Sequence, residues 1–328
     1  MTAKSNCTAI NIDFKKVFLP SVYVLVFIIG LAANCWGLKS MLVNWKKLGN
    51  VRIFVLNLGV ADLLHIITLP FLAYYENKKW IFGSTFCKMT RFCFNLNLYG
   101  SIGFLTCISL YRYLGIVHTM RFKGRISSHH CVAQSILVWL LVCVQITPDM
   151  YFEKIPPSAP YRCFDTALDK NLKQYFNYSI GWTIVGFCVP LLIILGCYGH
   201  VALVLSRKDN LQDSVKERSL RYVVTLAVLF SVCFIPFHVF RLLNLKTRIL
   251  KAEGTCQESF KSIYVAHQIC RGLVCLNSAI NPVVYLFLYN DAYVQFLRMK
   301  ERVRKSLGRL SLVALNSTSR TETPESPI

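Results

Sequence analysis

Acidic residues are scarce in this chain of 328 residues, which has 16 Asp and Glu against 37 Lys and Arg and a formal net charge of +21. The usual signatures of enzymes are missing as well. No zinc-spaced histidine pair, nucleophile elbow or phosphate-binding glycine loop stands in a coherent context, so an enzyme is not expected. The chain also lacks a solenoid repeat and any inverted similarity between its halves, which favours one domain over a duplicated transporter.

The first 16 residues have neither the apolar core nor the small-residue cleavage site of a signal peptide. They are polar and contain the sequon Asn6-Cys7-Thr8, so Asn6 is a candidate glycosylation site. Asn177 begins a second sequon, which would be disfavoured close to a bilayer. The first apolar segment is therefore expected to act as its own insertion signal.

Apolar residues are abundant: 54% of the chain is hydrophobic and the mean hydropathy is +0.45, above the level of soluble proteins. The surplus lies in seven long runs, 17–43, 51–75, 87–118, 131–152, 176–205, 219–245 and 260–288. Each run is long enough to cross a bilayer. The sequence thus predicts an all-α fold, a seven-transmembrane helix bundle over 17–288, preceded by segment 1–16 and followed by segment 289–328. Residues 290–302 predict a short amphipathic helix on the membrane surface.

Basic residues mark the expected cytoplasmic side. They follow the first and third runs and surround the connection between the fifth and sixth, at Lys46, Lys47, Arg52, Arg121, Lys123, Arg125, Arg207, Lys208, Lys216, Arg218 and Arg221. The positive-inside rule then places the N-terminus outside the cell and predicts a multi-pass plasma membrane protein. Because topology accounts for this charge, a nucleic-acid partner is not expected.

The opposite side is basic too, which topology does not require. Its loops hold more cations than acids, namely Lys78, Lys79, Lys154, Arg162, Lys170, Lys173, Lys246, Arg248, Lys251 and Lys261. This excess would attract an anionic ligand to the outer mouth. Solvated loop charges without a role are the alternative for each single lysine.

Four of the 14 cysteines fall on the expected outer side: Cys7, Cys87, Cys163 and Cys256. An even number in an oxidising compartment implies two disulfides, and four cysteines allow three pairings. The favoured pairing is Cys87–Cys163 with Cys7–Cys256. The first would tie the second outer loop to the third span, and the second would tie the N-terminus to the last outer loop.

Asp62 is the one acidic residue deep in a predicted span. A buried carboxylate needs a proton, a cation or a polar network. Candidate partners in other spans are Asn34, Ser101, Asn277, Ser278 and Asn281. Oxygen ligands around one negative charge suit a structural Na⁺, and a hydrogen-bonded polar cluster without an ion is the alternative. No other cofactor is expected.

Three arginines lie near the outer ends of three different spans: Arg91, Arg241 and Arg271. An arginine in hydrocarbon is costly, so each is expected to face a watery cavity or an anion. His238 and Gln268 stand three residues before Arg241 and Arg271, on the same helical faces. Arginine pairs bidentately with phosphate or carboxylate, so the three predict a cationic cup. Independent snorkelling of each to the interface is the alternative.

The whole pattern resembles the rhodopsin-like G-protein-coupled receptors. The motifs that carry the resemblance, in chain order, are Asn34, Leu58 to Asp62, Trp80, the Cys87 and Cys163 pair, Tyr111-Arg112-Tyr113, Trp139, Pro190, Tyr198, Phe230 to Pro236 and Asn281-Pro282-Val283-Val284-Tyr285. Within that family, Cys163-Phe164-Asp165-Thr166, the HVFR and QICR pairs and the segments around Tyr99 and Ser109 are similar to the purinergic nucleotide receptors, with the adenine-nucleotide subgroup the best match.

The resemblance implies specific roles. Arg91, Arg241 and Arg271 would contact the phosphates of an extracellular nucleotide such as ADP or ATP, with Asn244, His267, Asp165 and Thr166 as further contacts. The partner would be a heterotrimeric G protein, with Gq, phospholipase C and calcium as the expected route. Phosphorylated tail residues would recruit arrestin. The expected switch residues are Arg112, Tyr198, Phe230, Phe234, Asn281 and Tyr285.

The sequence departs from the family pattern at four positions. Tyr111 replaces the acid that usually precedes the arginine of the third helix, and Lys216 stands where an acid could have paired with Arg112. Phe234 replaces a frequent tryptophan, and His267 stands where adenine-nucleotide relatives often carry tyrosine. Dicarboxylate receptors are close relatives in this family and also use clustered arginines, so a receptor for a dicarboxylate such as succinate or 2-oxoglutarate is the alternative ligand class. A transporter or channel is the alternative of another kind, although it would need a polar path beyond Asp62 and its neighbours.

Overall fold

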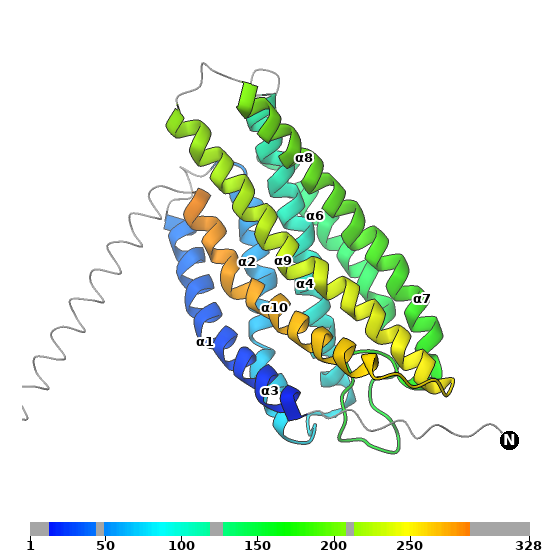
Figure 1. Cartoon of the computed structure of the whole chain (residues 1–328). Coiled ribbons are helices and arrows are strands. Elements are labelled where there is room, and N and C mark those ends of the chain that lie inside the picture. Colours follow the sequence, from blue (N-terminus) through cyan, green and yellow to red (C-terminus); the bar gives the residue numbers. More distant parts are fainter. Residues whose placement is uncertain (1–12, 44–48, 119–126, 208–212, 289–328) are drawn as a thin grey trace, which may run out of the picture. The chain divides into compact units, whose positions relative to one another are not determined.

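The computed structural model describes residues 13–43, 49–118, 127–207 and 213–288. The chain divides into two compact units, Met1–Pro282 and Val283–Ile328. The first unit is a bundle of long helices, and Figure 1 shows how they run alongside one another. No strand occurs among the described residues, so the all-α prediction is confirmed.

The helices have the following bounds: α1 Asp13–Val43, α2 Arg52–Ile66, α3 Leu69–Asn77, α4 Gly83–Val117, α6 Ser128–Ile146, α7 Leu172–Thr183, α8 Val189–Arg207, α9 Asp213–Ala252 and α10 Ser259–Leu288. Two short 3₁₀ turns, η2 Thr147–Met150 and η3 Asp169–Asn171, follow α6 and precede α7. A π-helical turn, η4 Ile184–Cys188, joins α7 to α8.

Two predicted spans are interrupted. The second is divided into α2 and α3 at Thr68, where the Oγ1 hydroxyl and the backbone N–H both donate to the carbonyl of His65 (2.7 and 2.9 Å). Pro70 then occupies the first turn of α3, where its missing N–H costs nothing. The fifth span contains η4 immediately before Val189 and Pro190. Helical structure already resumes at Asp169, so the connection between the fourth and fifth spans is shorter than the gap between the predicted runs 131–152 and 176–205.

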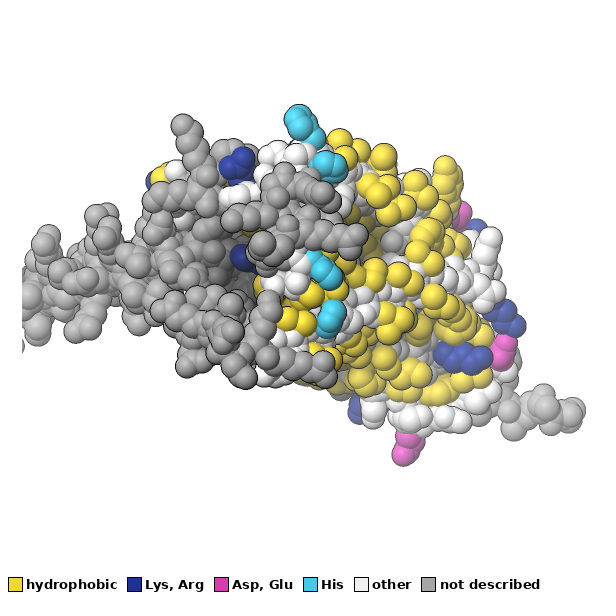
Figure 2. Space-filling model, turned by 90° about the horizontal axis from the view of Figure 1, so that it is seen from above, with side chains coloured by type: hydrophobic (Ala, Val, Ile, Leu, Met, Phe, Trp, Pro, Cys, Tyr) yellow, Lys and Arg dark blue, Asp and Glu magenta, His cyan; other side chains and the backbone are white. Residues whose placement is uncertain are grey.

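Six stretches of the described chain are long and apolar enough to cross a membrane, in α1, α2 with α3, α4, α6 with η2, α7 with α8, and α9. The remaining helix of the bundle, α10, is interrupted by Arg271, Asn277 and Asn281, which lowers its apolar content. Figure 2 shows a broad band of hydrophobic side chains on the flank of the bundle with few charges among them. Such a flank suits contact with lipid.

Helix α4 is the centre of the bundle. It packs against α2, α6 and α8, and buried residues follow one another along most of its length. At Gly103 a Cβ would lie only 2.7 Å from Val138 Cγ1 on α6. The absence of a side chain there therefore permits the close approach of α4 and α6.

The Cys87–Cys163 disulfide is present, as predicted, and joins the start of α4 to the loop between η2 and η3. The Tyr75 hydroxyl accepts a hydrogen bond from the Cys163 backbone N–H (2.9 Å), and Trp80 packs on the disulfide. We call this end of the bundle the disulfide end. Cys256 is also disulfide-bonded, but Cys7 lies outside the described residues, so the Cys7–Cys256 pairing stays a prediction. Asn6 lies outside them as well, whereas Asn177 is an exposed residue of α7.

Candidate ligand-binding site

The three predicted arginines meet in one small pocket. Arg91 comes from α4, Arg241 from α9 and Arg271 from α10, and the pocket has a volume of about 20 Å³. Its other lining residues are Phe94, Asn95, Asp165, Thr166, Phe237 and His267. The structure thus gathers residues of distant parts of the chain at the disulfide end.

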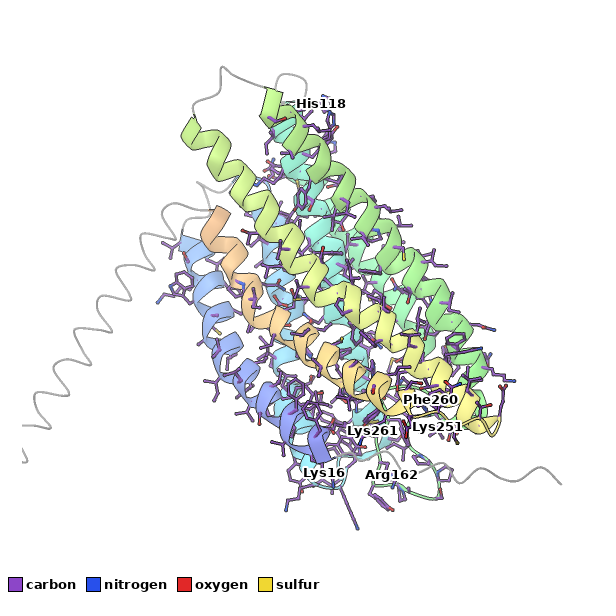
Figure 3. All side chains as sticks on the ribbon, viewed as in Figure 1. Lys16, His118, Arg162, Lys251, Phe260 and Lys261 are labelled. Carbon is purple, nitrogen blue, oxygen red and sulfur yellow. A yellow bond between two sulfur atoms is a disulfide. The ribbon has the colours of Figure 1, made fainter. Side chains whose placement is uncertain are left out.

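A larger cavity of about 300 Å³ shares Arg91, Asp165 and Arg271 with the small pocket. Its lining adds three cations, Lys15, Arg248 and Lys251, and the polar or aromatic side chains of Tyr75, Phe164, Asn244, Thr247, Tyr264 and Gln268. In Figure 3, Lys251 and Arg162 lie at the same end of the bundle, and His118 lies at the other. The two spaces together form a cationic cavity at the disulfide end.

Arg91 and Arg271 keep unused hydrogen-bond donors although each is only 3% exposed. Arg91 Nη2 donates to the carbonyl of Cys163 (3.0 Å), whereas its Nε and Nη1 have no partner among the described residues. Arg271 Nη1 lies 3.4 Å from Asp165 Oδ2, and its Nη2 also has no described partner. The Arg271 guanidinium lies over the rings of Tyr23 and Phe94 (6.0 and 5.8 Å). These contacts hold both planar groups in place while leaving donors available.

Asp165 is the acidic residue of both spaces and comes from the loop that the disulfide anchors. Burial alone would raise the pKa of its carboxyl. The guanidinium of Arg271, with His267 and Arg91, outweighs that effect and holds the pKa well below its usual range. Asp165 is therefore ionised at neutral pH and offsets part of the positive charge.

Arg241 is held differently, because Nη2 donates to the hydroxyl of Tyr175 (3.1 Å) on α7 rather than to a carboxylate. Tyr175 is fully buried against Phe152. Nothing in the sequence singled out Tyr175, since an aromatic residue at a helix start is ordinary. Its role is visible only once α7 and α9 pack together.

Arg248 fastens the loop over the cavity and was predicted only as one of many outer charges. It donates to the Thr166 hydroxyl, to the carbonyl of Ala167 (3.2 Å) and to Asp169 Oδ1 (2.7 Å). Thr166, expected as a ligand contact, is thus engaged by Arg248 and also lines the small pocket. Arg248 of α9 thus holds the loop in place, and we call its contacts with Thr166, Ala167 and Asp169 the clasp.

The remaining expected contacts divide into two groups. Asn244 and Gln268 line the larger cavity, and His267 lines the smaller one. His238 lines neither space. Its ring stacks on Phe187 at 4.2 Å, and neither ring nitrogen has a partner among the described residues.

Asp62 lies in a polar cluster further along the bundle. Asn97 Nδ2 donates to Asp62 Oδ1 (2.8 Å), and Asn281 Nδ2 donates to both carboxylate oxygens (3.0 and 2.9 Å). Ser101 and Ser278 both bind Asn97, and the Ser278 hydroxyl also interacts with the Asp62 carboxylate. Both oxygens of Asp62 accept hydrogen bonds from amides, and the sodium site stays a prediction.

Two other residues expected near Asp62 have no described hydrogen bond to it. The Asn34 amide donates to the Ser278 carbonyl (2.8 Å), so it belongs to the edge of the cluster. Asn277 is buried, but its Nδ2 has no partner among the described residues. His65, which the sequence did not single out, joins the cluster through the Ser278 hydroxyl (3.2 Å).

The expected switch residues lie further from the cavity. The Tyr198 hydroxyl and Ser109 Oγ are 2.6 Å apart and connect α8 to α4. Phe230 and Phe234 are in ring contact on α9, with centroids 5.0 Å apart. Arg112 lies near the end of α4 opposite to the disulfide end. The side chains of Tyr285 and Lys216 lie outside the described residues.

Comparison with known proteins identifies the family to which the chain is similar. Residues 34–285 match the model of the family described as 7 transmembrane receptor (rhodopsin family). The chain is 37% identical to purinoceptor 1 of Homo sapiens over 324 residues, which cover 97% of this chain and 86% of that protein. It is 39% identical to purinoceptor 1 of Bos taurus over 318 residues, covering 95% and 84%. It is 33% identical to purinoceptor 4 of Xenopus laevis over 302 residues, covering 90% and 56%.

These matches confirm the resemblance drawn from the motifs. They identify a multi-pass plasma membrane receptor rather than an enzyme, with the seven-helix bundle that the apolar runs predicted. The chain therefore belongs to the rhodopsin-like G-protein-coupled receptors and is a relative of the purinoceptors.

Proposed function

We propose that this receptor binds an extracellular nucleotide of the ADP or ATP type in the cationic cavity and activates a heterotrimeric G protein of the Gq class. The disulfide end faces outward in this proposal, in agreement with the positive-inside distribution of the sequence. The opposite end, with Arg112, faces the G protein, and arrestin binds the phosphorylated tail. The names of the purinoceptor relatives support a purine ligand.

Unpartnered arginine donors carry the proposal. Nε and Nη1 of Arg91 and Nη2 of Arg271 are buried, line the same pocket and have no partner in the described part of the chain. A buried donor without a partner costs about 1–3 kcal/mol, and more when it is charged. A phosphate oxygen would satisfy these donors with the planar geometry that arginine favours.

The larger cavity favours a nucleotide over a small dicarboxylate. Its volume of about 300 Å³ lies at the lower end of the range for small-molecule sites, roughly 300–1,000 Å³. The amides of Asn244 and Gln268 and the rings of Tyr75 and Tyr264 line it. Amide groups and aromatic faces suit a base and a sugar, which a dicarboxylate lacks.

Ligand binding activates the receptor if the ligand favours the active arrangement of helices over the resting one. Arg241 is one of the cavity residues of α9, the helix whose outward movement would open a cleft for the G protein. Pro236 interrupts the hydrogen bonding of this helix five residues before Arg241, which suits a bend. The ligand would therefore act on α9 through Arg241.

A concentration–response panel tests the proposal. Cells without endogenous nucleotide receptors express the chain and are exposed to ADP, ATP, UTP, UDP, succinate and 2-oxoglutarate, with cytosolic calcium as the readout. G-protein dissociation measured with each of the main Gα classes runs in parallel, so that coupling other than Gq is detected. A response to a nucleotide at lower concentration than to either dicarboxylate is expected. A response confined to the dicarboxylates would overturn the nucleotide proposal.

A further inference from the structure

A second buried ionic cluster lies beside the cationic cavity and has no place in the proposed ligand contacts. Lys154 Nζ is 2.9 Å from Asp149 Oδ2, and both side chains are at most 3% exposed. Asp149 belongs to η2 at the end of α6, and Lys154 belongs to the loop that leads to the Cys87–Cys163 disulfide. A buried ion pair is not in itself a stabilising feature, because both charges lose their water. Stability therefore does not explain why this ion pair is buried here, and a functional role is the better explanation.

The cluster reaches the cavity through two residues. Asn95, which lines the small pocket, donates from Nδ2 to Asp149 Oδ2 (3.2 Å). Tyr175 lies under the ammonium group of Lys154, with Nζ 5.7 Å from its ring centroid, and its hydroxyl interacts with the Asp149 carboxylate. That same hydroxyl accepts the hydrogen bond of Arg241 Nη2 at 3.1 Å. A continuous set of contacts thus connects the ion pair to the arginine of α9.

Charge balance explains why a lysine accompanies the carboxylate. A lone Asp149 so close to Tyr175 would draw Arg241 away from the cavity and neutralise it. Lys154 supplies the counter-charge to Asp149, and Arg241 donates to the neutral hydroxyl of Tyr175 rather than to the carboxylate. Burial lowers the pKa of the Lys154 ammonium, and the Asp149 carboxylate opposes that shift. Arg241 therefore keeps its positive charge available to an anion while its guanidinium is oriented.

We propose that Tyr175, together with the Asp149–Lys154 ion pair, positions the Arg241 guanidinium for the anionic part of the ligand. This inference rests on the proposed function, because it assigns these residues to the same site. They are positioning residues, since none of them lines either described cavity. The end of α6 and the start of α7 are thereby coupled to ligand recognition on α9.

A double-mutant cycle between Tyr175 and Arg241 tests the inference. Tyr175→Phe removes only the hydroxyl and keeps the buried ring. We expect it to raise the nucleotide concentration for half-maximal response by about tenfold, as is typical for loss of a hydrogen bond to a charged group. In the Arg241→Ala background the same change should have almost no further effect, because the group to be positioned is gone.

Two further variants separate positioning from folding. Tyr178→Phe is the matched control, because its hydroxyl donates to the Gln145 carbonyl (2.7 Å) rather than to Arg241; its potency should equal that of the wild type. Lys154→Met leaves Asp149 free to attract Arg241. This variant should therefore reduce potency in the wild-type background but have almost no effect in the Arg241→Ala background. The response of every variant is normalised to the amount of receptor at the cell surface, measured by surface labelling.

The outcomes are distinct. Non-additive effects of Tyr175→Phe and Arg241→Ala support the positioning role. Additive effects, or equal losses for Tyr175→Phe and Tyr178→Phe, overturn it while leaving the nucleotide proposal intact. A wild-type receptor that ignores every nucleotide overturns the proposed function itself, and the assignment of Arg241 to a nucleotide falls with it.

Discussion

Arg91 Nη2 donates to the carbonyl oxygen of Cys163 at 3.0 Å, and Cys163 is disulfide-bonded to Cys87, which lies one helical turn before Arg91. The covalent bond and the hydrogen bond therefore fix the loop and the guanidinium together. The loop residue Asp165, two positions further on, then reaches Arg271 on α10. The geometry of the cationic cavity depends on this attachment.

Breaking the disulfide should impair the cavity as well as the fold. Loss of a native disulfide typically costs about 2–5 kcal/mol, and here it also releases the carbonyl that orients Arg91. Cys163→Ser is expected to lower surface expression and to shift the nucleotide response of the molecules that reach the surface by at least about tenfold. Cys93→Ser on the same helix as Cys87 is the control, because Cys93 is a free thiol. Unchanged potency in Cys163→Ser would contradict the role of the disulfide in orienting Arg91.

Arg271→Ala should abolish the agonist response without reducing surface expression. The change removes the N–H groups that face the pocket and leaves Asp165 without its closest cation. Arg271→Lys retains the charge but not the planar fork, so an intermediate potency is expected. Calcium responses normalised to surface labelling provide the measurement. Full potency in Arg271→Ala would remove this residue from the ligand site.

Arg248→Met should loosen the loop over the cavity. The substitution removes three contacts, to Thr166, the Ala167 carbonyl and Asp169. Amide hydrogen exchange in residues 164–169 is expected to become at least about tenfold faster, because local opening loses the clasp. Lys251→Met changes another cation of the same cavity and should leave this exchange unaltered. Equal protection in the two variants would argue against the clasp.

Asn281→Ala should destabilise the receptor more than Asn277→Ala. Asn281 donates to both oxygens of Asp62, so its loss leaves a buried carboxylate short of donors, at about 1–3 kcal/mol. The melting temperature in detergent is expected to fall by about 3 °C or more. Asn277, whose Nδ2 has no described partner, is the matched control on the same helix. A larger loss for Asn277→Ala would show that the polar cluster has a different centre.

The fold was predictable because each membrane span is visible in the sequence as a long apolar run. The cationic cup was predictable for the opposite reason, since Arg91, Arg241 and Arg271 are expensive within such runs. The break at Thr68 was not predicted, although Pro70 is visible, because prolines are common inside membrane helices and seldom divide them.

The supporting residues could not be identified from sequence. Tyr175, Arg248, Asp149 and Lys154 have ordinary types at ordinary places, namely helix ends and outer loops. Their roles come from partners that are far away in the chain, such as Arg241 beside Tyr175. Only the packing of α7, α9 and the loop on one another establishes these pairs.

Helix α9 can act as a lever with two arms of unequal length on either side of Pro236. It is one helix of 40 residues, about 60 Å long at about 1.5 Å per residue. Pro236 divides it so that Arg241 lies on a short arm of about 8 Å, whereas Asp213 ends a long arm of about 35 Å. A rotation about Pro236 that moves Arg241 by about 1 Å would displace the far end by about 4 Å. A shift on the scale of one hydrogen bond in the cavity is thus large enough, mechanically, to make room for a partner at the other face of the membrane.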